Sequence, residues 1–163
     1  MKTTFLNCRK EDRKAFRERG RKHLQGRSNN FKLFQKYGSE PSEVDNHPNW
    51  DNLLPDAQLA IKAVFDEIGS FYSYGLSIDY QLPEGRKAGY LRYQLSWGGP
   101  SDEIRFYFAH GARQCHKIEY VFLDWGTGVG FDVTNEDWAQ WLFDWFNESQ
   151  TVEIEVQKAL ENR

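Results

Sequence analysis

The sequence has little cysteine and no long apolar run. Its two cysteines, Cys8 and Cys115, are far apart and fit no zinc-ligand spacing, so we expect neither a disulfide framework nor a structural metal. No window holds 18 consecutive apolar residues, which argues against a membrane-spanning helix. The N-terminal residues also lack the apolar segment of a signal peptide. These absences together predict a cytoplasmic protein with reduced thiols.

Aromatic residues are abundant by contrast. They make up 16% of the 163 residues and include six tryptophans. A chain of this length can bury a substantial core without disulfides or metal, and we expect a few large side chains to supply much of that core.

Charge is divided unevenly along the chain. Residues 1–40 hold twelve bases and four acids, whereas residues 41–163 hold nine bases and twenty acids. We therefore divide the chain into a basic N-terminal helical arm, residues 1–40, and a body, residues 41–163. Such an arm seeks an acidic partner, or it docks on the acidic body of its own chain.

The arm supplies one candidate site, for nucleic acid. Its bases recur on broad faces of the expected helix, as they do on helices that bind nucleic acid. Acids at positions 11, 12 and 18 interrupt the pattern, and aromatic residues are sparse there. The candidate nucleic-acid-binding residues are Arg9, Lys10, Arg13, Lys14, Arg17, Arg21 and Lys22.

The body changes periodicity along its length. Apolar residues at helical spacing predict helices over 56–68 and 135–147 and a further terminal helix, and we expect Trp138, Trp141 and Trp145 to be buried. Between these helices, apolar and polar residues alternate over 74–82, 90–97, 104–108 and 117–124, with a further short strand expected near 129–133. The pattern predicts an α+β fold: an antiparallel meander of four to five strands, covered by amphipathic helices.

The corner between two of these strands reads SWGGPSDE. Alternation predicts that Trp97 faces the core, while Gly98, Gly99 and Pro100 suit a tight turn. In a meander this corner lies beside the loop that follows the strand over 117–124. Every residue of the corner has a structural reason, so we first read it as an ordinary hairpin corner. The functional alternative is a partner-binding rim at this end of the sheet, made of Trp97, Asp102, Glu103, Asp124 and Trp125.

Catalytic and metal sites are less well supported by the residues. Asp102, Glu103 and Asp124 are candidate acid–base groups, with His110 or His116, but no activated nucleophile accompanies them. The trio of His110, Cys115 and His116 offers three ligands without a known zinc spacing. We therefore expect no catalytic residue, no metal and no cofactor.

Two segments, LSWGGPSDE and IEYVFLDWGTG, resemble small uncharacterised proteins encoded by bacteriophages and plasmids. The resemblance covers roughly residues 90–146. It implies a counter-defence protein of the anti-restriction or anti-CRISPR type, acting in the cytoplasm of a bacterial host. The expected function is a non-catalytic interaction module that inhibits a bacterial defence complex by direct binding; the alternative is a nucleic-acid-binding accessory protein that uses the basic arm.

Overall fold

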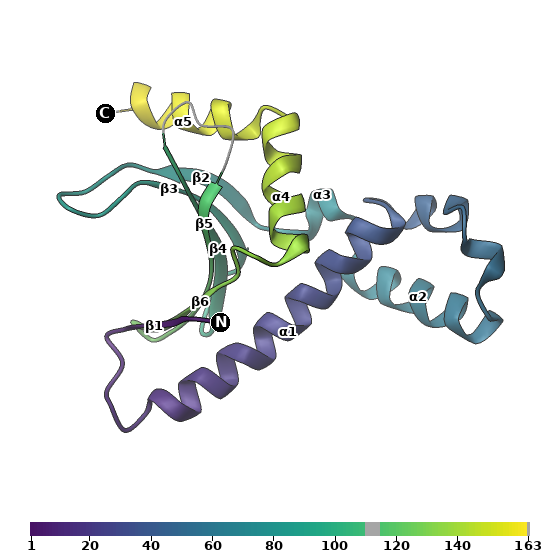
Figure 1. The fold of residues 1–163 in the computed structure, drawn as a ribbon, viewed down its shortest axis with the longest axis horizontal. Helices are drawn as coiled ribbons and strands as arrows, with labels where there is room; N and C mark the ends of the chain where they lie inside the picture. Colours follow the sequence, from purple (N-terminus) through teal and green to yellow (C-terminus); the bar gives the residue numbers. More distant parts are fainter. Residues whose placement is uncertain (110–114, 163) are drawn as a thin grey trace.

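A computed structural model describes residues 1–109 and 115–162, and it is built on one antiparallel sheet of six strands (Figure 1). The strands lie in the order β1-β6-β5-β4-β3-β2. The α+β prediction is confirmed, although the sheet has six strands where four to five were expected. The strands are β1 (Thr3–Leu6), β2 (Ser77–Gln81), β3 (Tyr90–Ser96), β4 (Ser101–Phe108), β5 (Cys115–Asp124) and β6 (Thr127–Asp132).

Strands β2 to β6 form the expected meander, and β1 is the additional strand. It pairs with β6 through Thr3 opposite Phe131 and Leu6 opposite Gly128. Gly128 is closely packed in this pairing, since an added Cβ would lie 2.8 Å from a methyl group of Leu123 and 3.0 Å from one of Leu6. The N-terminal segment therefore closes one edge of the sheet.

Five α-helices and two short 3-10 helices complete the described fold. The helix expected over 56–68 is confirmed as α2, and those expected over 135–147 and at the C-terminal end are confirmed as α4 and α5. None of the described helices is long and apolar enough to cross a membrane. The elements are α1 (Arg13–Tyr37), η1 (Pro41–Asn46), η2 (Trp50–Asn52), α2 (Pro55–Ile68), α3 (Phe71–Tyr74), α4 (Asp137–Glu148) and α5 (Thr151–Glu161).

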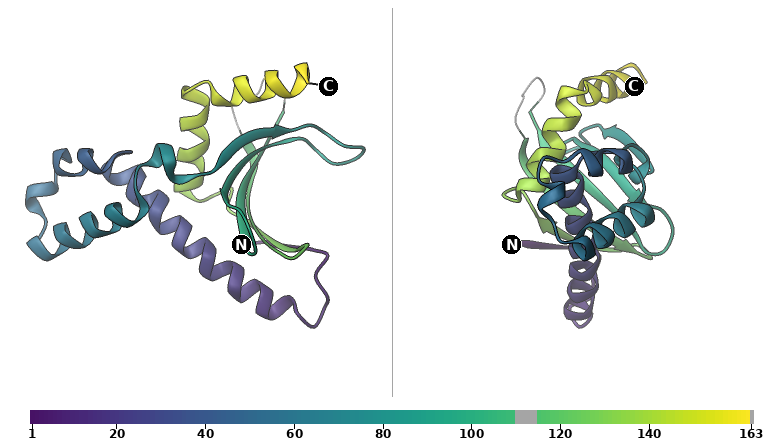
Figure 2. Two further views of the ribbon diagram at one scale, coloured as in Figure 1. Left: turned by 180° about the vertical axis from the view of Figure 1, so that it is seen from behind. Right: turned by 90° about the vertical axis from the view of Figure 1, so that its right-hand side faces the viewer.

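The position of α2 differs from the expectation that it covers the sheet. In Figure 2, α2 projects away from the sheet together with the 3-10 helices, while α1 and α4 lie against one face. The reason is that Phe65 of α2 packs edge-on against Phe34, near the C-terminal end of α1, with ring centroids 5.7 Å apart.

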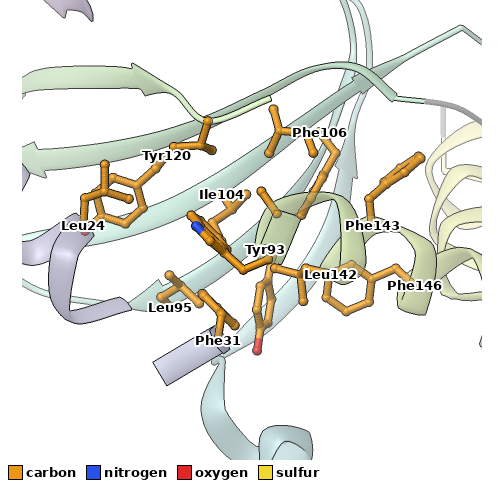
Figure 3. Close-up of a cluster of buried hydrophobic side chains, with 14 of the residues drawn as sticks. Leu24, Phe31, Tyr93, Leu95, Ile104, Phe106, Tyr120, Leu142, Phe143 and Phe146 are labelled. Atoms are coloured by element: carbon orange, nitrogen blue, oxygen red, sulfur yellow. The ribbon is translucent and has the colours of Figure 1, made fainter. Parts of the chain in front are cut away.

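The core lies between the sheet, α1 and α4 (Figure 3). Alternate residues of β3 and β4, among them Leu91, Tyr93, Ile104 and Phe106, face the helices and are buried. Trp138 of α4 stacks on Phe31 of α1, with parallel rings 5.3 Å apart. Large aromatic side chains therefore join the two helices to the sheet.

The basic segment of residues 1–40 shares this core. Its helix α1 buries Phe16, Leu24, Phe31 and Phe34 along one side. That side is narrow, and the remaining positions of the helix carry most of its charged residues. Of the two possibilities for the arm, docking on the protein's own acidic body is the arrangement seen here.

Two glycines of α1 give a test of how closely this helix approaches the sheet. A Cβ added to Gly20 would lie 2.8 Å from side-chain atoms of Phe131 and Val129, both fully buried, whereas one added to Gly26 would meet nothing within 4 Å. We expect Gly26→Ala to stabilise the protein by about 0.5–1 kcal/mol, because alanine is the better helix former. Gly20→Ala should instead destabilise it by about 1–3 kcal/mol through overpacking. Chemical denaturation of both variants measures the difference; equal stabilisation by both would contradict this close packing.

Candidate functional site

The two corners expected to lie together do so. The β3–β4 corner and the β5–β6 turn meet at one end of the sheet, because Ser101 of β4 pairs with Leu123 of β5. A methyl group built on Gly99 would lie 3.4 Å from Nε1 of Trp125. The first corner contains a cis peptide bond between Gly99 and Pro100.

Trp97 does not face the core, which corrects the expectation from alternation. The pairing of β3 with β4 shifts register between Gln94 and Ser96, and the last pair joins Ser96 to Asp102. Trp97 follows this irregularity, outside the ladder, and 79% of it is exposed to solvent. A bulge interrupts the two-residue period, so counting alternate residues through it assigns the wrong face.

Trp125 occupies an unusual backbone position. It forms, with Gly126, the two-residue connection between Asp124 and Thr127, and both connecting residues have positive φ, +47° and +76°. Hairpin turns of this kind favour asparagine, aspartate or glycine, and a bulky residue there is strained. Trp125 is also 93% exposed, so packing does not offset the strain.

Asp102 is buried, which corrects its expected place on an exposed rim. Only 1% of its side chain is exposed, and Arg27 of α1 binds both its carboxylate oxygens, at 2.7 and 3.0 Å. The hydroxyl groups of Tyr120 and Ser96 also donate to it. Alternation accounts for this position, because Asp102 is in phase with the core residues Ile104 and Phe106.

The electrostatics of this cluster favour a charged carboxylate. Burial raises the pKa of Asp102, but the hydrogen bonds and the positive charge of Arg27 outweigh that effect, and the pKa lies below its ordinary value. Burial and the neighbouring Asp102 carboxylate raise the pKa of Tyr120. The hydrogen-bonded cluster of Arg27, Asp102 and Tyr120 therefore holds α1 against the sheet.

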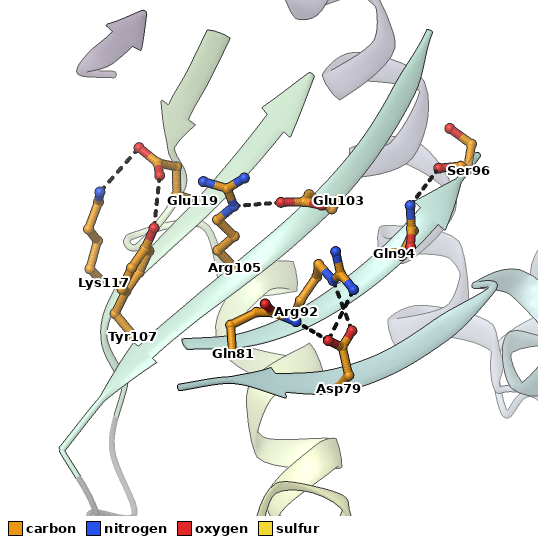
Figure 4. A network of polar contacts seen from close by, with 10 residues as sticks. All are labelled: Asp79, Gln81, Arg92, Gln94, Ser96, Glu103, Arg105, Tyr107, Lys117 and Glu119. Atoms are coloured by element: carbon orange, nitrogen blue, oxygen red, sulfur yellow. Dashed lines mark hydrogen bonds and ion pairs between the residues drawn. The ribbon is translucent and has the colours of Figure 1, made fainter. Parts of the chain in front are cut away.

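Glu103 lies on the opposite face of the sheet and is also buried (Figure 4). It accepts a hydrogen bond from Arg105, and Glu119 on the neighbouring strand accepts bonds from Lys117 and Tyr107. Glu103 is therefore not exposed at the corner, because its carboxylate is held within this network of the sheet face.

Asp124 remains near the surface and contacts the basic helix. Its carboxylate accepts a hydrogen bond from Arg19 of α1 at 2.7 Å. The Arg19 side chain is 52% exposed and also lies over the rings of Phe16 and Phe122. Of the five predicted rim residues, two tryptophans are freely exposed, Asp124 is partly exposed, and two carboxylates are buried.

The predicted metal trio is only partly described. His110 lies outside the described residues, and His116 is exposed. The thiol of Cys115 donates to the backbone oxygens of Tyr107 and Lys117, and burial raises its pKa to about 11. Within residues 1–109 and 115–162, no three side chains of the metal-binding types are grouped for an ion.

The candidate nucleic-acid residues lie on α1 and the turn before it, and all are exposed. The guanidinium groups of Arg13 and Arg17 lie over the ring of Phe5, 5.1 and 5.3 Å from its centre. Reasoning from sequence did not identify Arg27 as the partner of Asp102. The charge contrast between arm and body indicates that such ion pairs can form, but no local sequence pattern identifies two partners 75 residues apart.

Comparisons with known proteins give no relative. No family model matches the chain, and neither a curated protein nor a solved structure matches it. The arguments for function therefore rest on the exposed tryptophan corner and on the charge of α1.

Proposed function

We propose that this protein is a non-catalytic interaction module that binds another protein through the corner carrying Trp97 and Trp125. The observation that supports the proposal is the exposure of two tryptophans on adjoining turns, 79% and 93%. Tryptophan is the residue type most enriched among binding hot spots. Two exposed indoles at one end of a sheet are costly to hydrate and suit a protein partner.

The backbone strain at Trp125 supports the same proposal. Its positive φ makes tryptophan a poor choice for folding at this turn. Strained residues that the core does not require are concentrated at functional sites. A glycine follows each tryptophan, and a Cβ added to Gly98 or Gly126 would meet nothing within 4 Å, so the space beside these residues is open to a partner.

The proposed partner is a complex of a bacterial defence system. This part rests on the resemblance of residues 90–146 to proteins of bacteriophages and plasmids. Inhibition would follow from occupying a surface that the complex needs for its own assembly or for its target.

A double variant tests the corner. Trp97→Ala with Trp125→Ala should weaken capture of the partner by at least about 30-fold, because truncating one hot-spot residue costs about 2 kcal/mol or more. Capture by purified bacterial defence complexes, measured by surface plasmon resonance, gives the affinities. The matched control is Leu54→Ala with Tyr72→Ala, which truncates two other exposed apolar residues away from the corner. Equal affinities for the two double variants, or no binding by the wild type, would contradict the proposal.

Trp125→Asn separates binding from folding. Asparagine tolerates positive φ, so we expect this variant to be more stable by about 0.5–1 kcal/mol while it binds the partner more weakly. Thermal unfolding beside the binding assay measures both effects. A loss of stability would show that Trp125 serves the fold.

A further inference from the structure

The solvent side of α1 carries basic residues that fall on one line. We define the cationic stripe as Lys14, Arg17, Arg21, Lys32 and Lys36, which are separated by three, four, eleven and four residues and are all exposed. Gln25, also exposed, divides the interval of eleven into four and seven, so the line is continuous at helical spacing. One acid lies on this line: Glu18, also exposed, is four residues after Lys14 and three before Arg21, so five bases outnumber one acid along the stripe.

The charges of the stripe are available to a partner. Within the described part of the chain, no carboxylate lies within ion-pair distance of any of the five, whereas Arg19 and Arg27 on other sides of the same helix are paired. The helix cannot turn to bury them, because Phe16, Leu24 and Phe31 hold the adjoining side in the core. Figure 2 shows α1 along the margin of the molecule, with one side facing away from the sheet.

We propose that the cationic stripe binds the phosphate backbone of double-stranded DNA without sequence preference. From Lys14 to Lys36 the helix rises about 33 Å, at roughly 1.5 Å per residue, close to the length of one turn of B-form DNA. An α-helix is about as wide as the major groove, so the stripe can follow the phosphates beside it. This inference goes beyond the protein-binding corner and does not depend on it.

Two other anionic partners fit the stripe less well. A membrane surface requires apolar residues beside the bases, and the apolar residues of α1 are buried against the sheet. Single strands are held by exposed aromatic rings on which bases stack, whereas the rings in contact with the stripe, Phe5 and Tyr37, are covered by Arg17 and Lys36. The phosphates of a rigid duplex remain the best match.

Salt dependence tests the proposal. Five phosphate contacts predict that affinity for duplex DNA of about two helical turns falls roughly 500-fold between about 50 and 200 mM salt. Lys14→Gln, Arg21→Gln and Lys32→Gln together remove three contacts, and affinity should then fall only about 10-fold over the same range. Fluorescence anisotropy with labelled DNA gives the slopes.

A matched control removes the same net charge elsewhere. Lys62→Gln, Arg86→Gln and Lys87→Gln alter exposed bases outside α1 and should leave the wild-type salt dependence unchanged. All three proteins should melt at similar temperatures, because the altered side chains are exposed. Absence of DNA binding at low salt would overturn the proposal, as would equal salt dependence of the two triple variants. Tighter binding to duplex RNA, single-stranded DNA or vesicles of anionic lipid would also overturn it.

Discussion

Asp102→Ala is expected to destabilise the protein by about 3–5 kcal/mol, because it leaves the Arg27 guanidinium without its carboxylate between α1 and the sheet. Arg27 is 22% exposed, so water relieves part of this cost and favours the lower end of the range. The buried hydroxyl of Tyr120 also loses its acceptor. Chemical denaturation followed by tryptophan fluorescence measures the loss.

A second substitution distinguishes an unpaired charge from a general packing defect. Arg27→Met combined with Asp102→Asn removes both charges and leaves an acceptor for Tyr120. We expect this double variant to recover most of the stability that Asp102→Ala loses, since replacing a buried ion pair by neutral groups is often close to neutral. A double variant at least as unstable as Asp102→Ala would contradict the interpretation.

The surface pair at the same end of the sheet is the matched control. Asp124→Ala removes the carboxylate that binds Arg19, whose side chain is 52% exposed. The Asp124 side chain is only 14% exposed, but half of Arg19 lies in solvent, so the pair should contribute about 1 kcal/mol and this variant should lose far less stability than Asp102→Ala. The contrast tests whether burial, rather than charge itself, makes Asp102 important.

The same cluster predicts how stability depends on pH. The pKa of Asp102 is lowered in the folded protein, so its contribution is fully present above the pKa of an unfolded aspartate, about 4. It is lost as the pH falls through the folded-state value. Below about pH 4, the wild type should therefore lose stability relative to the double variant Arg27→Met with Asp102→Asn, which has no carboxylate to protonate at this position.

The periodicity of the body predicted most of the sheet. Alternation over 90–97, 104–108 and 117–124 located β3, β4 and β5 to within a few residues. Strand β1 was not predicted, because four residues carry too little periodicity to separate a strand from a tail. It becomes a strand only because the edge of β6 is available for pairing.

The errors at the candidate site have two physical causes. The register shift after Gln94 places Trp97 at the surface, and no sequence signal marks such a bulge. Asp102 was assigned to the rim because aspartate is usually exposed, although its phase with Ile104 and Phe106 indicates the core. Its burial depends on Arg27, which only the folded chain brings near.

At Gly20, local helix propensity and tertiary packing favour different residues. In a polar helix a glycine predicts weakness, and α1 is accordingly expected to be only partly stable alone. In the fold, the missing side chain is what allows the helix to approach Phe131 and Val129. A residue unfavourable for the isolated helix therefore favours its packing.

Trp138→Ala is expected to cost about 3–5 kcal/mol, the range for removing a large aromatic side chain from a core. Trp138 is fully buried and stacked on Phe31, so its loss opens a cavity between α1 and α4. The sequence pattern gave the same expectation for Trp141, but Trp141 and Trp145 are only partly buried against the core. Their alanine variants should each cost less than Trp138→Ala.

The other tryptophans of the chain provide the control for Trp138. Trp97→Ala and Trp125→Ala remove the same side chain from the surface, and each should change stability by no more than about 0.5 kcal/mol. Trp138→Phe refines the comparison, because the buried Nε1 of Trp138 has no hydrogen-bond partner among the described residues. Phenylalanine keeps most of the ring and removes that unsatisfied donor, so it should cost much less than alanine. Calorimetric unfolding of these variants compares the sites. A loss at Trp97 or Trp125 as large as that at Trp138 would mean that the corner belongs to the core, and it would remove the basis for a binding surface there.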